Sequence, residues 1–184
     1  MKGKIFNEQE VQAMLNGSKV MFREVAKIKL NLSCYDVDKK EFYDDPIFKK
    51  CPYQVGQKIF VKESFYEDLT YRKFAGFEAK DGLLEINARY MKQEHSRLTL
   101  QIIEIRAERL RDIDEEGARQ EGVIDSGCGN CGESEFDCKC KIPEPLPKDD
   151  FIFNWNATHK KPEEEFNANP WVWVLKFELV KNNL

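Results

Sequence analysis

The sequence has no long apolar run, no excess of basic residues and few histidines, and each shortage narrows the functions to consider. No run approaches the roughly 18 to 20 apolar residues that a membrane-spanning helix needs, and the opening MKGKIFNEQE lacks the apolar core of a signal peptide. We therefore expect a cytoplasmic protein that does not contact a membrane. The two histidines, His95 and His159, have no clear Cys or Asp partner in the sequence, so we expect neither to be catalytic.

Acidic residues slightly outnumber basic ones. The chain has 33 Asp and Glu against 29 Lys and Arg, which gives a formal net charge of −4 at pH 7. A surface of this charge repels nucleic acid weakly as a whole. Any binding of nucleic acid must therefore use a local basic patch.

The length and composition are those of a folded domain. The 184 residues can enclose one hydrophobic core without disulfides. The apolar fraction of 41% and the aromatic fraction of 12% exclude disorder of the whole chain. We predict a single domain over residues 1–184. Residues 123–148 form an insertion in it, because Gly, Cys, Pro and acidic residues replace the periodic apolar pattern there.

The predicted elements are short helices and apolar strands. Asn7 caps a helix with Glu10 three residues later, and Gly17 ends that helix. Residues 26–57 read as an irregular connection that closes with a turn at Val55-Gly56-Gln57. Strands are predicted over residues 58–65, 83–90, 97–105 and 171–180, and two further helices over residues 114–122 and 151–159.

One strand carries a break in its pattern. Leu98, Leu100 and Ile102 alternate onto one face, and then Ile103 and Ile105 switch to the other parity. Such a switch indicates a β-bulge or a bend within the strand.

Four of the six cysteines lie in the segment CGNCGESEFDCKC, at Cys128, Cys131, Cys138 and Cys140. In a reducing cytoplasm such thiols point to metal binding or burial before disulfides. The glycines between them let the backbone turn around an ion, and no iron–sulfur spacing is matched. We predict that the four thiolates bind Zn²⁺, with a closed ligand shell that makes the metal structural and not catalytic.

The alternatives for this segment are a disulfide pair, or free thiols in a flexible loop. Cys34 and Cys51 lie far away in the sequence, beside polar segments that contain proline. They read as ordinary thiols.

Four segments together resemble a known family. They are the helix ending at Gly17 with Lys19 and Arg23 after it, then VGQKIFVKESF, SRLTLQIIEIRAERLRDIDEEGARQEG and NANPWVWVLKFELV. In this order they resemble ASCH-domain proteins of the PUA-like superfamily, especially those of phages and prophages. The resemblance covers most of the chain outside residues 26–50 and 123–148. It implies an α+β fold, with a small mixed β-barrel flanked by short helices, and a cleft that in related domains holds RNA or a modified nucleobase.

Some ASCH relatives are amidohydrolases that remove an acyl group from modified cytidine. They use a Lys, a Thr three residues later and a Glu from a following strand. The matching positions here are Lys19, Phe22 and Glu63. Phe22 supplies no hydroxyl, so the resemblance leaves Lys19 and Glu63 as the candidate catalytic pair, with a plain surface ion pair as the alternative.

Our leading hypothesis is a module that binds nucleic acid, in particular RNA or another single strand, or a modified nucleotide. The candidate binding residues are Lys19, Arg23, Lys62, Ser64 and Arg97. One alternative is an amidohydrolase acting on acylated nucleosides. Another is a phage factor that binds a host or virion protein through its acidic surface and its cysteine-rich insertion.

Two further groups of residues have competing interpretations. Arg97, Arg106 and Arg109 suggest a basic stripe, but Glu104 and Glu108 interleave with them and favour a salt-bridged, solvated face. The aromatic rings of Trp155, Trp171 and Trp173 are able to stack on bases, although packing in the core is the expectation for Trp173.

Overall fold

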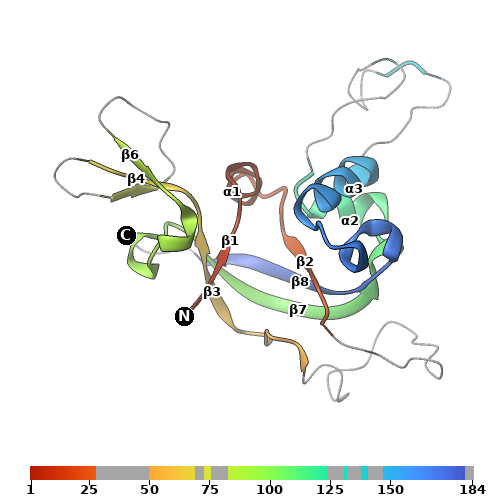
Figure 1. Cartoon of the computed structure of the whole chain (residues 1–184), viewed down its shortest axis with the longest axis horizontal. Coiled ribbons are helices and arrows are strands. Elements are labelled where there is room, and N and C mark those ends of the chain that lie inside the picture. Colours follow the sequence, from red (N-terminus) through yellow and green to blue (C-terminus); the bar gives the residue numbers. More distant parts are fainter. Residues whose placement is uncertain are drawn as a thin grey trace.

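A computed structural model describes residues 1–27, 50–68, 73–75, 83–123, 131, 138–140 and 147–180. The predicted insertion lies largely outside these ranges, and so do Cys34 and Cys128. The described part is an α+β fold built on a mixed five-stranded sheet (Figure 1). In strand order the sheet contains β1 (Lys2–Ile5), β3 (Lys58–Lys62), β7 (Thr99–Arg109), β8 (Trp171–Val180) and β2 (Met21–Val25).

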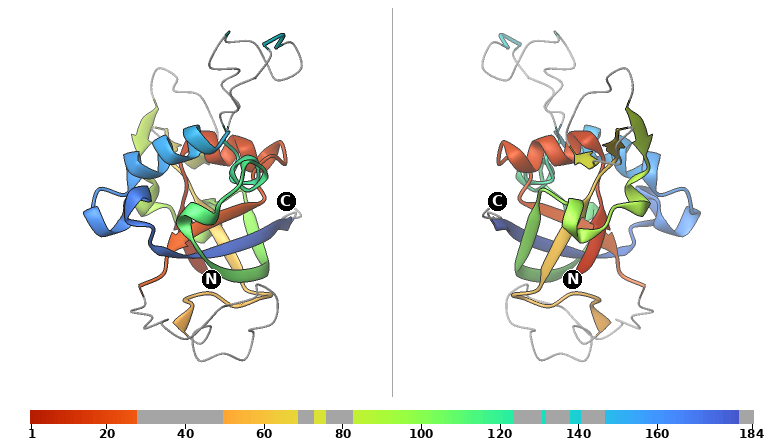
Figure 2. Two further views of the ribbon diagram at one scale, coloured as in Figure 1. Left: turned by 90° about the vertical axis from the view of Figure 1, so that its right-hand side faces the viewer. Right: turned by 90° about the vertical axis from the view of Figure 1, so that its left-hand side faces the viewer.

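The sheet is curved, and its two edge strands are left unpaired with each other. β1 pairs parallel to β3, and every other neighbouring pair is antiparallel. Figure 2 shows the long strands β7 and β8 bending, so that the sheet curls round. The predicted barrel is therefore observed only as an open, curved sheet, because within the described residues no backbone ladder joins β1 to β2.

The predicted bulge is confirmed in β7. Its register against β8 shifts between Ile102 and Glu104, at the point where the apolar pattern changes parity. An extra residue in one strand increases the local bend of an antiparallel pair. The bulge therefore contributes to the curl of the sheet.

Two of the predicted strands end earlier than expected. The strand over residues 58–65 breaks after Lys62, and the chain crosses into a second sheet with the order β5 (Lys73–Ala75), β4 (Phe65–Glu67) and β6 (Leu84–Ile86). The strand over residues 83–90 shrinks to β6. Asn87 ends it, because its side chain accepts a hydrogen bond from the backbone of Arg89 and so caps the short 3₁₀-helix η2 (Ala88–Tyr90).

The predicted helices form where their caps lie. In α1 (Glu8–Leu15) the side chain of Asn7 accepts from the Glu10 backbone, and Glu10 reaches back to Asn7, which completes a capping box. In α2 (Glu115–Gln120) the side chain of Asp114 caps Gly117. α3 (Pro147–Thr158) begins four residues before the predicted start. The short 3₁₀-helices are η3 (Gln93–His95), η4 (Leu110–Asp112), η5 (Pro162–Glu164) and η6 (Phe166–Ala168).

The core lies on both faces of β8. Trp173, Leu175 and Phe177 alternate along β8 and point into the main cluster inside the curved sheet. Val172 and Val174 face the other way and pack in a second cluster with residues of α2 and α3. This second cluster holds the two helices against the sheet. Within the described part of the chain, no helix is long and apolar enough to cross a membrane.

Gly122 provides a test of how closely the end of α2 approaches α1 and Lys19. Its φ is +78°, and an added Cβ would lie 2.6 Å from Cβ of Lys19 and 2.8 Å from Cβ of Ala13. We expect Gly122→Ala to lower the free energy of unfolding by about 2 to 4 kcal/mol, from backbone strain plus the clash. Urea denaturation measures the loss.

Gly56→Ala is the matched control. Gly56 has a φ of +83°, but an added Cβ meets nothing within 4 Å, so only the strain of roughly 1 kcal/mol applies. Equal losses in the two variants would contradict the close approach at Gly122.

Candidate functional site

A cleft of about 690 Å³ opens between the two edge strands and α3. Its walls come from the end of β1 and the start of α1, from Lys19, from β2, from residues 121–123 and from one face of α3. The cleft therefore lies where the curved sheet fails to close. Clefts of this size suit small ligands.

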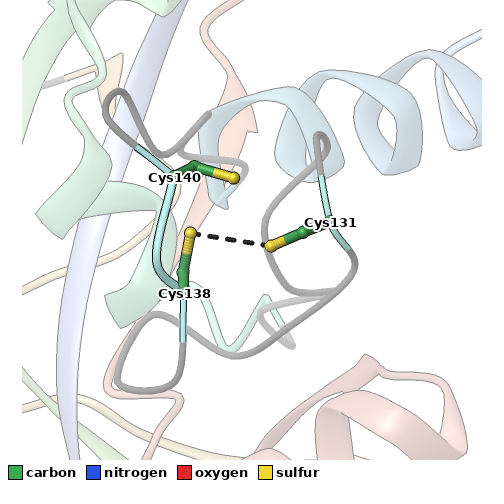
Figure 3. A group of neighbouring side chains, drawn as sticks. All are labelled: Cys131, Cys138 and Cys140. Carbon is green, nitrogen blue, oxygen red and sulfur yellow. Dashed lines mark hydrogen bonds between the residues drawn. The ribbon is translucent and has the colours of Figure 1, made fainter.

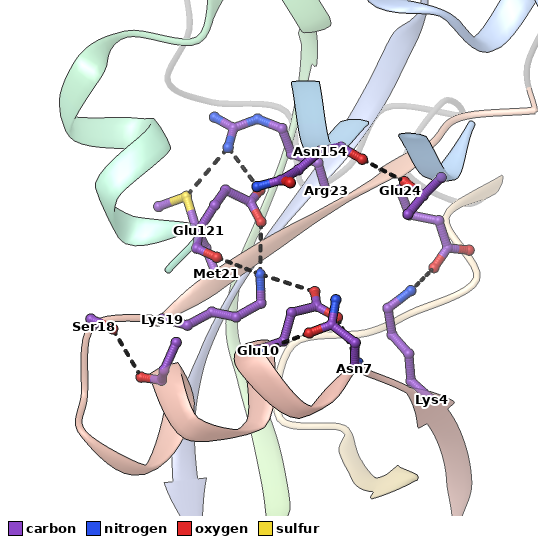
Figure 4. A network of polar contacts seen from close by, with 12 residues as sticks. Lys4, Asn7, Glu10, Ser18, Lys19, Met21, Arg23, Glu24, Glu121 and Asn154 are labelled. Atoms are coloured by element: carbon purple, nitrogen blue, oxygen red, sulfur yellow. Dashed lines mark hydrogen bonds and ion pairs between the residues drawn. The ribbon is translucent and has the colours of Figure 1, made fainter. Parts of the chain in front are cut away.

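A buried network of charges forms one wall of the cleft (Figure 4). Nζ of Lys19 donates to the backbone oxygen of Glu121 at 2.6 Å and to its Oε2 at 3.1 Å, and lies 3.4 Å from Oε1 of Glu10. The side chain of Lys19 is only 3% exposed. The turn at Gly17 places Lys19 against Glu121, where the two residues also form a backbone bridge.

Arg23 extends the same network across β2. Its NH1 donates to Oε1 of Glu121 at 2.8 Å, and its Nε and NH2 both donate to Oε1 of Glu108 at 3.0 and 2.8 Å. Glu121 therefore lies between two buried cations, and each of them is matched by carboxylates. An unpaired charge at this depth would be strongly unfavourable, so the network is as much structural as functional.

A second polar cluster joins the two edge strands. Lys4 of β1 donates to Oε2 of Glu24 in β2 at 2.9 Å, and the buried Tyr53 hydroxyl donates to the same oxygen at 2.8 Å. Figure 4 shows Lys4 and Glu24 reaching toward each other. The ion pair replaces the missing backbone ladder between β1 and β2 with a side-chain contact.

The ionisation of this cluster follows from its contacts. Burial alone would raise the pKa of Glu24, but the charge of Lys4 and the hydrogen bonds from Lys4 and Tyr53 outweigh it and hold that pKa below its usual value. Burial, and then the hydrogen bond to Glu24, raise the pKa of Tyr53. Glu24 is therefore a carboxylate and Tyr53 a neutral phenol at neutral pH.

Aromatic rings supply the apolar lining. Phe22 is buried beneath the cleft, and Nζ of Lys4 lies 4.7 Å from the centre of its ring. At the end of α3, the ring of Trp155 stacks on that of His159, the residue after the helix, with centroids 3.8 Å apart and an angle of 7° between their planes. Trp155 is fixed by a hydrogen bond from its Nε1 to the Glu164 backbone at 2.8 Å. Phe22 and Trp155 are almost fully buried, so the half-buried ring of His159 is the one that reaches the surface of the cleft beside the charged wall.

The sequence-predicted residues fall into two separate groups. Lys19 and Arg23 line the cleft, whereas Lys62, Glu63, Ser64 and Arg97 do not. Glu63 is buried and makes a two-pronged ion pair with Arg97, at 2.7 and 2.8 Å. The structure does not bring Lys19 and Glu63 together, because Lys19 is engaged by Glu121 and Glu63 by Arg97.

The remaining predicted residues lie on the surface around β3 and β7. Lys62 donates to the backbone oxygen of Arg89, and Ser64 is exposed where the chain passes between the two sheets. Arg106 pairs with Glu104 and Glu108, so the interpretation of a salt-bridged face is confirmed there. Arg109 lies with its guanidinium 4.6 Å from the ring centre of Trp171.

Sequence reasoning missed the residues that complete the site. Glu108 and Glu121 belong to the segment that carries the family resemblance, so their position there was an available signal. No sequence signal marked the cluster of Lys4, Glu24 and Tyr53, because these residues come from three separate segments that only the fold brings together. Trp173 packs in the core as expected, and Trp155 lines the cleft.

Three of the four predicted metal ligands lie together. The sulfur atoms of Cys131, Cys138 and Cys140 are all within 4.8 Å of one another, and those of Cys131 and Cys138 are 3.7 Å apart (Figure 3). Such a group is able to hold a metal ion. Cys128 lies outside the described residues. Cys51 is half-buried, and burial raises the pKa of its thiol, as fits an unreactive side chain.

Comparisons with known proteins leave the chain without an assigned family. No protein-family model matches it, and no curated protein matches it. Among solved structures it is similar to the crystal structure of protein EF3133 from Enterococcus faecalis V583, of family DUF984. The identity is 9% over 98% of this chain and 81% of that chain, with a TM-score of 0.43. Similarity at this level supports no conclusion about function.

The buried network predicts a large structural role for Lys19. Lys19→Ala leaves one oxygen of the buried Glu121 without its partner, so we expect the free energy of unfolding to fall by about 3 kcal/mol. Chemical denaturation measures this loss. As a control, Lys161→Ala removes a surface pair with Glu164 and should leave the unfolding midpoint unchanged. An unchanged midpoint for Lys19→Ala would contradict the structural role.

Proposed function

We propose that the protein binds a nucleotide, either free or as part of single-stranded nucleic acid, and holds its base in the cleft. The observation that carries this proposal is a cleft of about 690 Å³ whose lining combines aromatic side chains with fixed polar groups. A base offers the same combination of a flat apolar face and a hydrogen-bonding edge.

The charge of the cleft supports a base over a polyanion. Lys4, Lys19 and Arg23 line the cleft, but each is paired with a glutamate at 3.1 Å or less. Cations that are already neutralised attract phosphate weakly. The phosphate and sugar groups would then lie at the rim. Lys62 and Ser64 lie outside the cleft, so they are candidates only for contacts with the backbone of a longer strand.

The sequence resemblance to ASCH-domain proteins points the same way, since related domains hold RNA or a modified nucleobase. The geometry gives less support to hydrolysis of an acylated nucleoside. Phe22 replaces the hydroxyl residue, Lys19 is held by Glu121, and Glu63 is engaged by Arg97 away from the cleft. We therefore favour binding over catalysis.

For the cysteine segment we propose a structural zinc site. Cys131, Cys138 and Cys140 would provide three thiolates, and Cys128 is the expected fourth ligand from its CxxC spacing to Cys131. Four sulfur ligands leave no open position on the ion. The metal would order the inserted segment, residues 123–148, and take no part in the cleft.

Metal analysis tests the zinc site. We expect one zinc ion for each chain by elemental mass spectrometry, and loss of that zinc in Cys138→Ser. Cys51→Ser is the matched control, because Cys51 lies outside the group and should leave the zinc content unchanged. A protein purified with no zinc and unable to take it up would contradict the site.

Blocking the cleft tests the binding function. Ala157 is exposed on α3 and lines the cleft, so Ala157→Trp should fill it and weaken binding of nucleoside monophosphates and short single strands about tenfold or more. Calorimetric titration at low salt measures the affinities. Phe153→Trp is the control, since Phe153 is 74% exposed on the same helix and does not line the cleft.

The proposal fails if no nucleotide or strand binds the wild-type protein more tightly than about millimolar, the weak end of measurable affinities. It also fails if Ala157→Trp binds as well as Phe153→Trp, because the ligand would then lie elsewhere.

A further inference from the structure

Glu24 occupies a distinctive place in the cleft. It projects from β2, which forms one edge of the open sheet, and its side chain keeps 35% of its surface exposed although its neighbours Phe22 and Arg23 are buried. It lies two residues after Phe22, on the same face of β2, and is tied to Lys4 of the facing edge. Glu24 therefore lies at the polar margin of the aromatic floor.

The contacts of Glu24 fix one carboxylate oxygen and leave the other available. Lys4 and Tyr53 both donate to Oε2, at 2.9 and 2.8 Å. Within the described residues, no hydrogen bond to Oε1 is found. A carboxylate held by two donors on one oxygen cannot rotate freely, so Oε1 has a defined direction.

The other carboxylates of the charged wall are already engaged. Glu121 receives Arg23 on Oε1 and Lys19 on Oε2. Glu10 receives the Asn7 backbone on Oε2, and its Oε1 faces Lys19 at 3.4 Å. Of these three glutamates, Glu24 is the one with an oxygen left for a ligand.

We infer that Oε1 of Glu24 accepts a hydrogen bond from an amino or imino N–H of the bound base. The inference rests on the proposed function and makes it more specific. The cleft then selects bases that present an N–H donor and rejects bases whose amine is fully alkylated. A carboxylate is an acceptor only, and desolvating its charged oxygen without a donor is costly.

Glutamine at this position would reverse the preference. In Glu24→Gln the side-chain oxygen is needed to accept from Lys4 and Tyr53, which leaves the NH₂ group pointing at the ligand. A donor then faces the base where an acceptor stood. The substitution changes neither the length nor the shape of the side chain, so steric effects of alkylation remain equal in the two proteins.

The experiment compares adenosine monophosphate with its N6,N6-dimethyl form, and cytidine monophosphate with its N4,N4-dimethyl form, by calorimetric titration. For each pair whose unmodified member binds to wild type, we expect that member to bind at least about tenfold more tightly than its dimethyl form. Glu24→Gln should lose or invert this ratio. Glu8→Gln is the matched control, because Glu8 is exposed on α1 and does not line the cleft, and it should keep the wild-type ratio.

The outcomes separate the inference from the proposed function. Equal binding of both members by wild type, or an unchanged ratio in Glu24→Gln, overturns the inference alone. Absence of binding to every nucleotide overturns both. If Glu24→Gln does not fold, Tyr53→Phe is tested in its place. This change removes one donor from Oε2 of Glu24 and loosens the carboxylate, so the ratio of the two affinities should fall severalfold. An unchanged ratio contradicts the inference.

Discussion

The rest of the site depends on the ion pairs that the buried carboxylate of Glu121 makes with Lys19 and Arg23. It neutralises Lys19, which follows the turn after α1, and Arg23, which belongs to β2, and it comes itself from the residue that ends α2. The segment from α1 to β2 is thereby fixed to the end of α2, about a hundred residues further along the sequence, around one buried charge. Without the Glu121 carboxylate, the two buried cations would lose the acceptor that they share, and Lys19 would keep only the more distant carboxylate of Glu10, at 3.4 Å.

The cleft exists because the curved sheet does not close. β1 and β2 are its edges, and a side-chain contact between Lys4 and Glu24 joins them in place of backbone hydrogen bonds. Space remains between the edges, beneath α3, and aromatic rings line it. The fold thus places aromatic side chains and a fixed carboxylate in one lining, and this is the arrangement that we propose recognises a base.

Local features were predictable from the sequence and long-range ones were not. The capping box at Asn7, the bulge near Ile102 and the strand over residues 171–180 follow from spacing within a few residues. Glu63 follows the break in β3 and pairs with Arg97, and Lys19 pairs with Glu121, which is 102 residues away, so neither pairing has a local signal. The cluster of Lys4, Glu24 and Tyr53 unites three segments, so only the folded chain reveals it.

The central claim is that a base enters the space between β1, β2 and α3. Amide chemical shifts in a ¹H–¹⁵N spectrum, followed while a nucleoside monophosphate is added, test it most directly. The account predicts that the largest changes gather at the lining residues Phe22, Glu24, Asn154 and Ala157. Changes centred instead on the surface of Lys62, Ser64 and Arg97, or no changes at all, would contradict it.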